Sequence, residues 1–461
     1  MRAKVADLPK DLTGEHRPDT TPADDVTRGA RAVVVHPEIR AHKKDGRKAG
    51  DVEVRLEEAQ GLARAIGIVV ADAFAIPVRA VRPATLFGEG QIERIALAAT
   101  QEDAELVVVD GSLSAVQQRN LEEKLKRKVI DRTGLILEIF GERAATAEGR
   151  LQVELAHLDY QAGRLVRSWT HLERQRGGFG FLGGPGETQI EADRRMIRTR
   201  MARIRRELEQ VRRTRGLHRD RRQRAPWPVV ALVGYTNAGK STLFNRLTGA
   251  SVMAEDLLFA TLDPTMRSIR LPGVDKAILS DTVGFISDLP TQLVAAFRAT
   301  LEEVTAADCI VHVRDIASPA TGEQRGQVEE ILADLEVIAA PGGESTIPII
   351  EAWNKWDLLS ADDAAMRRDL VQVQPSGRPA VAISAVTGEG VEALLEKISA
   401  TLSGGSKRYD FVLGAGEGQR IAWLHANGEV LADEAIEGEE GPQRRLSVRL
   451  SIRDFGRFSR V

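Results

Sequence analysis

Short apolar runs alternate with amphipathic, helix-like segments along the first third of the chain. Such alternation is typical of a mainly parallel sheet covered by helices. We therefore predict a small N-terminal α/β domain over residues 31–146 and, from their mixed polar composition, a disordered tail over residues 1–30. The predicted strands are Val33–Val35, Ile68–Val70 and Leu106–Val109, and the predicted helices are residues 51–65, 89–99 and 114–127.

Residues 147–224 follow a different pattern, in which apolar residues recur at alternating spacings of four and three. This spacing places a narrow apolar stripe along one side of a helix. Two such helices joined by a loop must cover each other's stripes, which predicts an antiparallel helical hairpin. The stripes consist of Leu151, Leu155, Leu158, Ala162 and Leu165 in the first helix, and of Ile197, Met201, Ile204, Leu208 and Val211 in the second.

The loop of this hairpin is unusual, because residues 177–186 hold six glycines, two phenylalanines and a leucine. The second helix is basic, with 14 Arg against five acidic residues over 190–224. One interpretation is a flexible linker. The other is a mobile tip that binds RNA, in which arginines pair with phosphates and aromatic rings stack on bases. The candidate RNA-binding residues are Arg174, Arg176, Phe179, Phe181, Arg194, Arg195 and Arg198.

Residues Gly234–Ser241 fit the pattern G-x-x-x-x-G-K-[ST], between a strand-like run and a helix-like one. In such a loop the backbone N–H groups curl around the phosphates of a nucleotide at the start of a helix. Lys240 would reach the outer phosphates. The hydroxyl of Ser241 would be a ligand of Mg²⁺, a cation that prefers oxygen.

Three later elements complete a nucleotide site. Asp281 ends an apolar strand and is followed by Gly284, whose amide is available to the terminal phosphate. Asn354–Asp357 reads N-K-x-D, and the carboxylate of Asp357 can accept from both donors of guanine, which adenine does not offer. Ser384–Ala385 follows another strand, where a backbone amide can meet the guanine carbonyl. These elements predict GTP binding by a doubly wound P-loop domain over residues 225–405.

We expect a threonine between the P-loop and Asp281 to complete the Mg²⁺ site. Thr261 and Thr265 both qualify by position, and the spacing alone does not choose between them.

The chain here resembles a known family. The runs GYTNAGKSTLFNRLTG, FATLDPT, DTVGFISDLP and NKWD are similar to those of the HflX family of translational GTPases in the Obg-like group, as are segments QQRNLE, IDRT and GPGETQ before the P-loop. The resemblance implies that Thr261 binds Mg²⁺. It also implies binding to the large ribosomal subunit and its rRNA, dissociation of stalled or idle ribosomes, and ATP use by the N-terminal part.

The motifs and the resemblance together define the predicted site. The expected metal ligands are Ser241 and Thr261. The expected GTP-binding residues are Gly234, Tyr235, Thr236, Asn237, Ala238, Gly239, Lys240, Ser241, Phe259, Ala260, Thr261, Leu262, Asp263, Asp281, Thr282, Val283, Gly284, Asn354, Lys355, Asp357, Ser384, Ala385 and Val386.

GTP hydrolysis should be slow unless another group orients the attacking water. Phe285 occupies the position where many small GTPases carry a Gln that orients water, and its side chain can neither donate nor accept. Asn237 has two interpretations. In related GTPases an Asn at this place ligates K⁺, but Asn is also a good turn residue. Gly88–Gly90 opens a predicted helix and is a weak candidate for a second nucleotide site.

Composition limits the remaining possibilities. The net charge of −3 argues against nucleic acid on average but hides the basic segment described above. The single cysteine, Cys309, lies in an apolar run and is expected to be buried. Without an apolar run of membrane length or a signal-like N-terminus, we expect a cytoplasmic protein. Residues 406–461 predict a small α+β domain with two strands around a helix.

Two other function classes remain open from the sequence. The first is a GTP-gated assembly scaffold that binds rRNA without splitting ribosomes. The second is an RNA-remodelling ATPase centred on residues 30–146.

Overall fold

The structure is a computed structural model. It describes residues 28–39, 50–175, 185–223, 227–250, 258–259, 265–287, 301, 303–373, 378–404, 406–414, 416–438, 441–451 and 458. None of the helices in these ranges combines the length and apolar character needed to cross a membrane. Of the predicted tail over residues 1–30, residues 1–27 lie outside the described residues.

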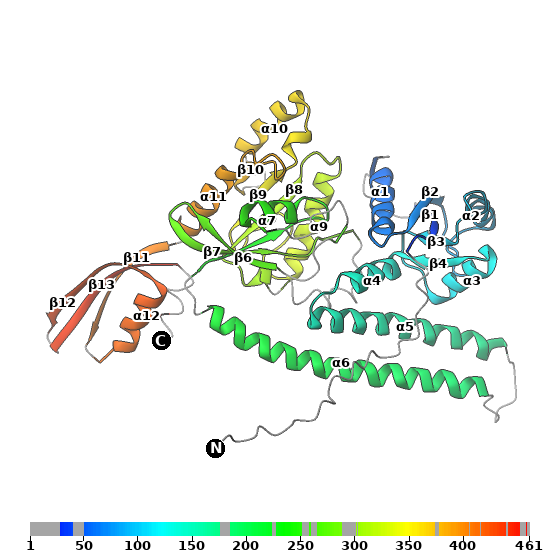
Figure 1. Cartoon of the computed structure of the whole chain (residues 1–461), viewed down its shortest axis with the longest axis horizontal. Helices are drawn as coiled ribbons and strands as arrows, with labels where there is room; N and C mark the ends of the chain where they lie inside the picture. Colours follow the sequence, from blue (N-terminus) through cyan, green and yellow to red (C-terminus); the bar gives the residue numbers. More distant parts are fainter. Residues whose placement is uncertain are drawn as a thin grey trace, which may run out of the picture.

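The N-terminal domain is a parallel α/β sheet, as predicted. Its strands run in the order β2-β1-β3-β4, and every pairing is parallel. The apolar runs of the sequence lie in the buried strands, and the helices cover both faces of the sheet (Figure 1). The elements are β1 (Arg31–Ile39), α1 (Gly50–Ala65), β2 (Val69–Val78), α2 (Glu89–Gln101), β3 (Leu106–Val109), α3 (Ala115–Leu125), β4 (Lys128–Asp131) and α4 (Arg132–Arg143).

Helix α4 begins in the interior of the protein. Asp131 caps it by accepting a hydrogen bond of 2.8 Å from the N–H of Gly134. Residues 132–137 are all buried, as are Ile139 and Phe140. A helix that is buried on almost every side is packed against other elements all around it. Helix α4 packs between the N-terminal sheet and the GTPase part of the chain.

Two long helices, α5 (Ala147–Gln175) and α6 (Pro185–Gln223), lie side by side in opposite directions (Figure 1). In α6 the predicted stripe is buried at Met201, Ile204 and Leu208. In α5 the described members of the predicted stripe are only half-buried. Among the α5 side chains that the structure describes, residues 147–164, the buried apolar ones are Val153 and Ala156, which join the apolar cluster that contains α4. Helix α5 therefore has two packed sides, one for α6 and one for the N-terminal domain.

The third part is a six-stranded sheet with the order β10-β9-β8-β5-β7-β6. Only β6 is antiparallel to its neighbour, so this is the parallel-rich sheet of a P-loop GTPase fold. Its elements are β5 (Val229–Val233), α7 (Lys240–Thr248), β6 (Thr265–Leu271), β7 (Val274–Asp281), β8 (Cys309–Asp315), α9 (Thr321–Asp334), β9 (Ile349–Asn354), the 3₁₀ turn η2 (Trp356–Leu358), α10 (Ala361–Val373), β10 (Ala380–Ala382) and α11 (Val391–Gly404). Cys309 is buried, as expected.

The C-terminal part is α+β, with one strand more than the sequence predicted. Strands β11 (Ser406–Gly414), β13 (Gly441–Ser451) and β12 (Glu429–Gly438) form an antiparallel sheet in that order, covered by α12 (Gly418–Asn427). The missed strand is β12, whose acidic side chains hide its apolar alternation. It lies at an edge of the sheet, where charged residues are well tolerated.

One apolar cluster extends from the N-terminal domain into the GTPase sheet. Phe140 of α4 packs edge-on against Phe259, with ring centroids 4.8 Å apart. The same cluster contains Val283, Phe285 and Ile286, which follow β7. The segments next to the nucleotide-binding loop are thus part of the interface with the N-terminal domain.

Candidate nucleotide site

The P-loop joins the end of β5 to the start of α7 and depends on its glycines. Gly239 has a φ of +91°, which favours glycine, and a Cβ there would overlap the side-chain amide of Asn354. Gly234, with a φ of +153°, would bring a Cβ into the backbone carbonyl of Val313. The loop can follow this course only because both positions lack a side chain.

The side chain of Lys240 folds back against the backbone of the P-loop. Its ammonium group donates hydrogen bonds to the carbonyl oxygens of Gly234 at 3.1 Å and Tyr235 at 2.8 Å. Burial lowers the pKa of Lys240 to about 8, although the charge of Asp281 acts to raise it. A desolvated cation held by two neutral carbonyls is well prepared to bind a phosphate group.

Two oxygen-bearing side chains meet where α7 begins. The hydroxyl of Ser241 donates to the carboxylate of Asp281 at 2.8 Å, and Asp281 is completely buried. A hydroxyl and a carboxylate are the donors that Mg²⁺ prefers, so these residues fit that ion. The other expected ligand, Thr261, lies outside the described residues, as do Ala260, Leu262 and Asp263. Thr282 uses its hydroxyl on the carbonyl oxygen of Leu232 at 2.6 Å, which is a structural contact.

The segment after β7 is pinned to the P-loop by backbone hydrogen bonds. The N–H of Thr236 donates to the carbonyl oxygen of Phe285 at 2.7 Å, and the N–H of Phe285 donates to that of Gly234 at 3.1 Å. A Cβ on Gly284 would lie 2.8 Å from Thr236 Cγ2 and 3.0 Å from Lys240 Nζ. Gly284 is therefore at the mouth of the loop, as its predicted role requires.

Two aromatic residues beside the predicted site, Phe259 of the GTP-binding set and Phe285 after Gly284, are buried in apolar surroundings. Phe285 is buried in the apolar cluster shared with the N-terminal domain, and Val283 lies in the same cluster. Phe259 is buried against Phe140 and has a φ of +59°, a backbone conformation uncommon for a side chain of its size. These side chains position the backbone beside the loop.

Asn354 holds the base-recognition end of the site to the phosphate end. Its side chain donates to the carbonyl oxygen of Ala238 at 2.7 Å and accepts from the N–H of Ala385 at 2.9 Å. Lys355 forms an ion pair of 2.8 Å with Asp315. Asp357 lies in η2 with an exposed side chain, so its carboxylate is accessible to a guanine base.

The rest of this end is built by the turn after β10. The buried hydroxyl of Ser384 accepts from the N–H of Thr387 at 3.0 Å. Arg246 of α7 donates to the carbonyl oxygen of Ala385 at 2.6 Å and to that of Val386, whose side chain is exposed. The turn is thus fixed by Asn354 on one side and by α7 on the other.

The structure favours one interpretation of Asn237 and of Gly88. Asn237 has an exposed side chain and a φ of +58°, a conformation that Asn tolerates well, so the turn accounts for it. A role as K⁺ ligand stays a prediction. Gly88 is the N-cap of α2, and its N–H donates to Gln91 at 2.8 Å, which gives this glycine a structural role.

The candidate RNA-binding residues are only partly described. The side chains of Arg174, Arg176, Phe179 and Phe181 lie outside the described residues. On α6, Arg195 and Arg198 are exposed and Arg194 is half-buried.

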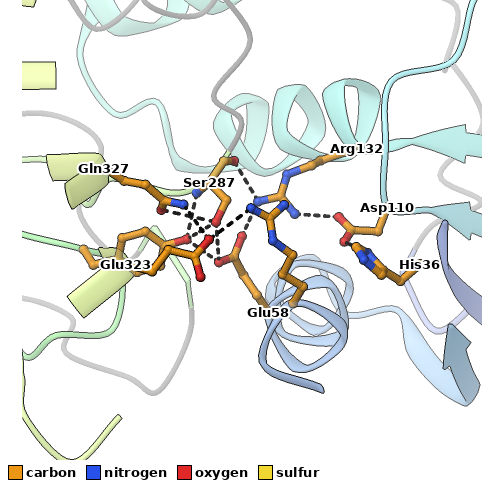
Figure 2. A network of polar contacts seen from close by, with 9 residues as sticks. His36, Glu58, Asp110, Arg132, Ser287, Glu323 and Gln327 are labelled. Atoms are coloured by element: carbon orange, nitrogen blue, oxygen red, sulfur yellow. Dashed lines mark hydrogen bonds and ion pairs between the residues drawn. The ribbon is translucent and has the colours of Figure 1, made fainter. Parts of the chain in front are cut away.

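Sequence reasoning missed a buried polar network beside the P-loop (Figure 2). Arg132, at the start of α4, donates to Asp110 at 2.5 Å, to the carbonyl oxygen of Ser287 at 2.9 Å and to Glu58. The second oxygen of Asp110 is 2.8 Å from Nδ1 of His36. The signal in the sequence was the IDRT segment, which was noted for its resemblance but had no assigned role.

Four family profiles match consecutive stretches of the chain. Those described as GTP-binding GTPase N-terminal and GTP-binding GTPase Middle Region match residues 53–141 and 143–222. One described as 50S ribosome-binding GTPase matches residues 229–355, and one described as HflX C-terminal domain matches residues 369–460.

Curated relatives are similar over most of their length. A GTPase HflX of Magnetococcus marinus is 48% identical over 385 residues, covering 84% of this chain and 86% of that protein. A GTPase HflX of Escherichia coli is 42% identical over 430 residues, covering 93% and 96%. A solved structure of a GTP-binding protein from Sulfolobus solfataricus in complex with GDP matches with a TM-score of 0.42 and 23% identity, covering 81% of this chain and 99% of that one.

Proposed function

The chain belongs to the HflX family of GTPases and hydrolyses GTP, and we propose that it does so on the large ribosomal subunit. In this proposal the GTP-bound protein binds the large subunit and its rRNA, and separates it from the small subunit in stalled or idle ribosomes. The description of the profile that matches residues 229–355, a 50S ribosome-binding GTPase, supports this partner.

The observation that carries the proposal is the basic outer face of α6. Its apolar stripe is buried against the hairpin, whereas Arg195, Arg198, Arg203, Arg205 and Arg206 are exposed. A row of exposed guanidinium groups on a rigid helix is suited to the phosphate backbone of RNA. The packing of the hairpin explains the apolar stripe but does not require this row of arginines. Arg203 is paired with Glu207 at 2.7 Å, and Arg206 donates to the carbonyl oxygen of Ala202 at 3.3 Å, both within the helix itself.

We propose that hydrolysis proceeds by in-line attack of water on the terminal phosphate. Lys240 and the N–H groups of the P-loop bind the phosphates, and the amide of Gly284 faces the terminal one. Mg²⁺, held by Ser241 with Asp281 beside it, would neutralise charge on the transferred group. Because the side chain of Phe285 is buried in the apolar cluster shared with the N-terminal domain and carries no polar group, it cannot orient the water, and we expect slow turnover in isolation.

The proposal is tested by sedimentation of ribosomes through sucrose with the full chain and GTP, GDP or a non-hydrolysable GTP analogue. GTP and the analogue should place the protein on the large subunit and shift 70S particles to free subunits, whereas GDP should not. Cosedimentation with large subunits without loss of 70S particles would instead favour the assembly-scaffold alternative.

A second test concerns the helix and the loop. Arg195→Gln with Arg198→Gln should weaken binding to the large subunit. The slope of log affinity against log salt concentration should become shallower by about one for each lost phosphate contact. Arg444→Gln with Arg449→Gln removes the same charge from the C-terminal sheet, where both arginines are in ion pairs, and should have little effect.

Deleting residues 177–186 tests the loop of the hairpin. The deletion should spare GTP binding and abolish ribosome splitting. Splitting at the wild-type rate would identify the segment as a linker.

A further inference from the structure

Tyr235, the second residue of the P-loop, has a buried hydroxyl that is fully used by two other parts of the chain. It accepts a hydrogen bond of 2.7 Å from the N–H of Ser287, and its oxygen is 2.6 Å from Ser287 Oγ. It also donates to a carboxylate oxygen of Glu58, on α1 of the N-terminal domain. Burial, with the nearby charge of Glu58, raises the pKa of Tyr235, so the phenol is neutral and remains a donor.

Arg132 completes this arrangement from the side of the N-terminal domain (Figure 2). Its guanidinium binds the other oxygen of Glu58 and the carbonyl oxygen of Ser287, so the backbone of Ser287 is held through both its N–H and its C=O. Although burial acts to lower it, the charges of Asp110 and Glu58 raise the pKa of Arg132, which stays protonated. Arg132 is 6% exposed, and such a buried cation with two carboxylates fixes its partners tightly.

Ser287 lies three residues after Gly284, so this contact bears directly on the segment that meets the terminal phosphate. That segment is fixed at two points. The backbone of Phe285 is bonded to Gly234 and Thr236, and the backbone of Ser287 is bonded to Tyr235 and Arg132. Gly284 adjoins the first of these points, within the close approach to Thr236 and Lys240 described above.

The N-terminal domain also contacts Leu258, in the segment that precedes β6. Gly61, one helical turn beyond Glu58 on α1, lies against Leu258: a Cβ on Gly61 would be 3.1 Å from Leu258 Cδ1. Residues three apart lie on the same face of a helix, so one face of α1 contacts both segments.

We propose that Tyr235 is a positioning residue for GTP hydrolysis. Its hydroxyl, oriented by Glu58 and Arg132 of the N-terminal domain, holds residues 284–287 so that the amide of Gly284 faces the terminal phosphate. The inference rests on the assignment of Gly284 to that phosphate. It makes the N-terminal domain a structural part of the GTPase site.

The expected signature is selective for GTP, because GDP lacks the phosphate that Gly284 would meet. Tyr235→Phe removes only the hydroxyl and leaves the ring in the core. Binding of a non-hydrolysable GTP analogue should weaken about tenfold and single-turnover hydrolysis should slow by at least about tenfold, since a buried hydrogen-bond partner is lost. GDP affinity should stay within about twofold of the wild type.

The same signature should appear when the change is made in the other domain. Glu58→Met removes both acceptor oxygens at similar side-chain length and should weaken analogue binding without affecting GDP. In the double variant the two effects should not add, because both changes break one network. Tyr160→Phe is the matched control: it removes a phenol hydroxyl whose hydrogen bond of 2.5 Å is to Asp131 rather than to Glu58 or Ser287, and it should leave both affinities unchanged.

Each of the following results would overturn the inference. Equal weakening of GDP and analogue binding by Tyr235→Phe would show a general structural role. An unchanged affinity ratio in both Tyr235→Phe and Glu58→Met would show that the hydroxyl positions nothing. Gly284→Ala separates this inference from the site assignment: if it alone loses preference for the analogue, the site stands and the role of Tyr235 fails. If Gly284→Ala also keeps that preference, the assignment of Gly284 fails and the inference with it.

Discussion

Asn354 donates a hydrogen bond of 2.7 Å to the carbonyl oxygen of Ala238, and this contact ties the end of β9 to the phosphate-binding loop. Asp357 follows Asn354 by three residues, after a backbone reversal at Lys355, which has a φ of +63°. The carboxylate proposed to recognise the base therefore has a fixed distance from the groups proposed to bind the phosphates.

Base recognition should depend on the carboxylate of Asp357. Asp357→Asn replaces one acceptor oxygen by a donor at the amino edge of guanine, where xanthine carries a carbonyl oxygen. We expect the preference to shift from GTP to xanthosine triphosphate by roughly a hundredfold or more, because an unpaired polar group is costly in such a site. Competitive binding of the two nucleotides measures the change, and unchanged GTP affinity would refute the role of Asp357.

Ser241→Ala and Lys240→Ala should weaken nucleotide binding by different routes. Loss of Ser241 removes one Mg²⁺ ligand, so a high Mg²⁺ concentration should restore part of the affinity. Loss of Lys240 removes a buried charge that faces the phosphates, costing roughly a hundredfold that Mg²⁺ cannot restore. Titration of GDP at low and high Mg²⁺ compares the two, and equal rescue would contradict these roles.

Nucleotide affinity should depend on pH through Lys240. With a pKa of about 8 in the absence of nucleotide, its ammonium group is largely protonated below that pH and progressively neutral above it. Bound phosphates favour the protonated form, so GDP affinity should be constant below about pH 8 and fall toward tenfold per pH unit above it. Lys240→Arg stays charged and should bind with a flat profile over the same range, whatever its absolute affinity.

A buried charge cluster between β8 and β9 of the GTPase sheet should stabilise the fold. Glu351 on β9 is completely buried and pairs with Arg314 on β8 at 2.6 Å. Glu351→Gln would leave the guanidinium without its main counter-charge and should reduce the free energy of unfolding by about 3 kcal/mol.

The pH dependence of this loss follows from the pKa of Glu351. Burial acts to raise that pKa, but the charge of Arg314 and a hydrogen bond from Trp353 lower it to about 2. A depressed folded-state pKa gives stability that is present above the unfolded value of 4.5 and is lost as pH falls toward 2. Urea unfolding of wild type and variant should therefore differ at neutral pH and converge in acid. Glu429→Gln, in an exposed ion pair with Arg449, is the control and should cost less than about 1 kcal/mol.

The sequence predicts the sheets and the GTPase fold because their determinants are local, and the proposed nucleotide site rests on equally local motifs. The P-loop glycines, the Asp281 turn and the Asn354 element each carry their chemistry within a few residues, and apolar runs mark buried parallel strands. The edge strand β12 escaped because Glu434 and Glu437 obscure its alternation, which is tolerated at an edge where one side of the strand is open.

Contacts between distant segments could not be predicted in this way. Arg132 and Ser287 are 155 residues apart, and nothing in either segment's pattern specifies the other. The second packed side of α5 likewise depends on the position of α4, because Val153 and Ala156 fall outside the regular stripe. Such placements follow from tertiary packing, which fixes buried polar partners only after the domains meet.

The most direct test of the account is GTP turnover by the full chain with and without purified large ribosomal subunits. Because Phe285 is buried and cannot orient water, we expect slow turnover by the protein alone and a stimulation of at least about tenfold by the subunits. Turnover that is already fast in isolation and unchanged by large subunits would contradict this expectation.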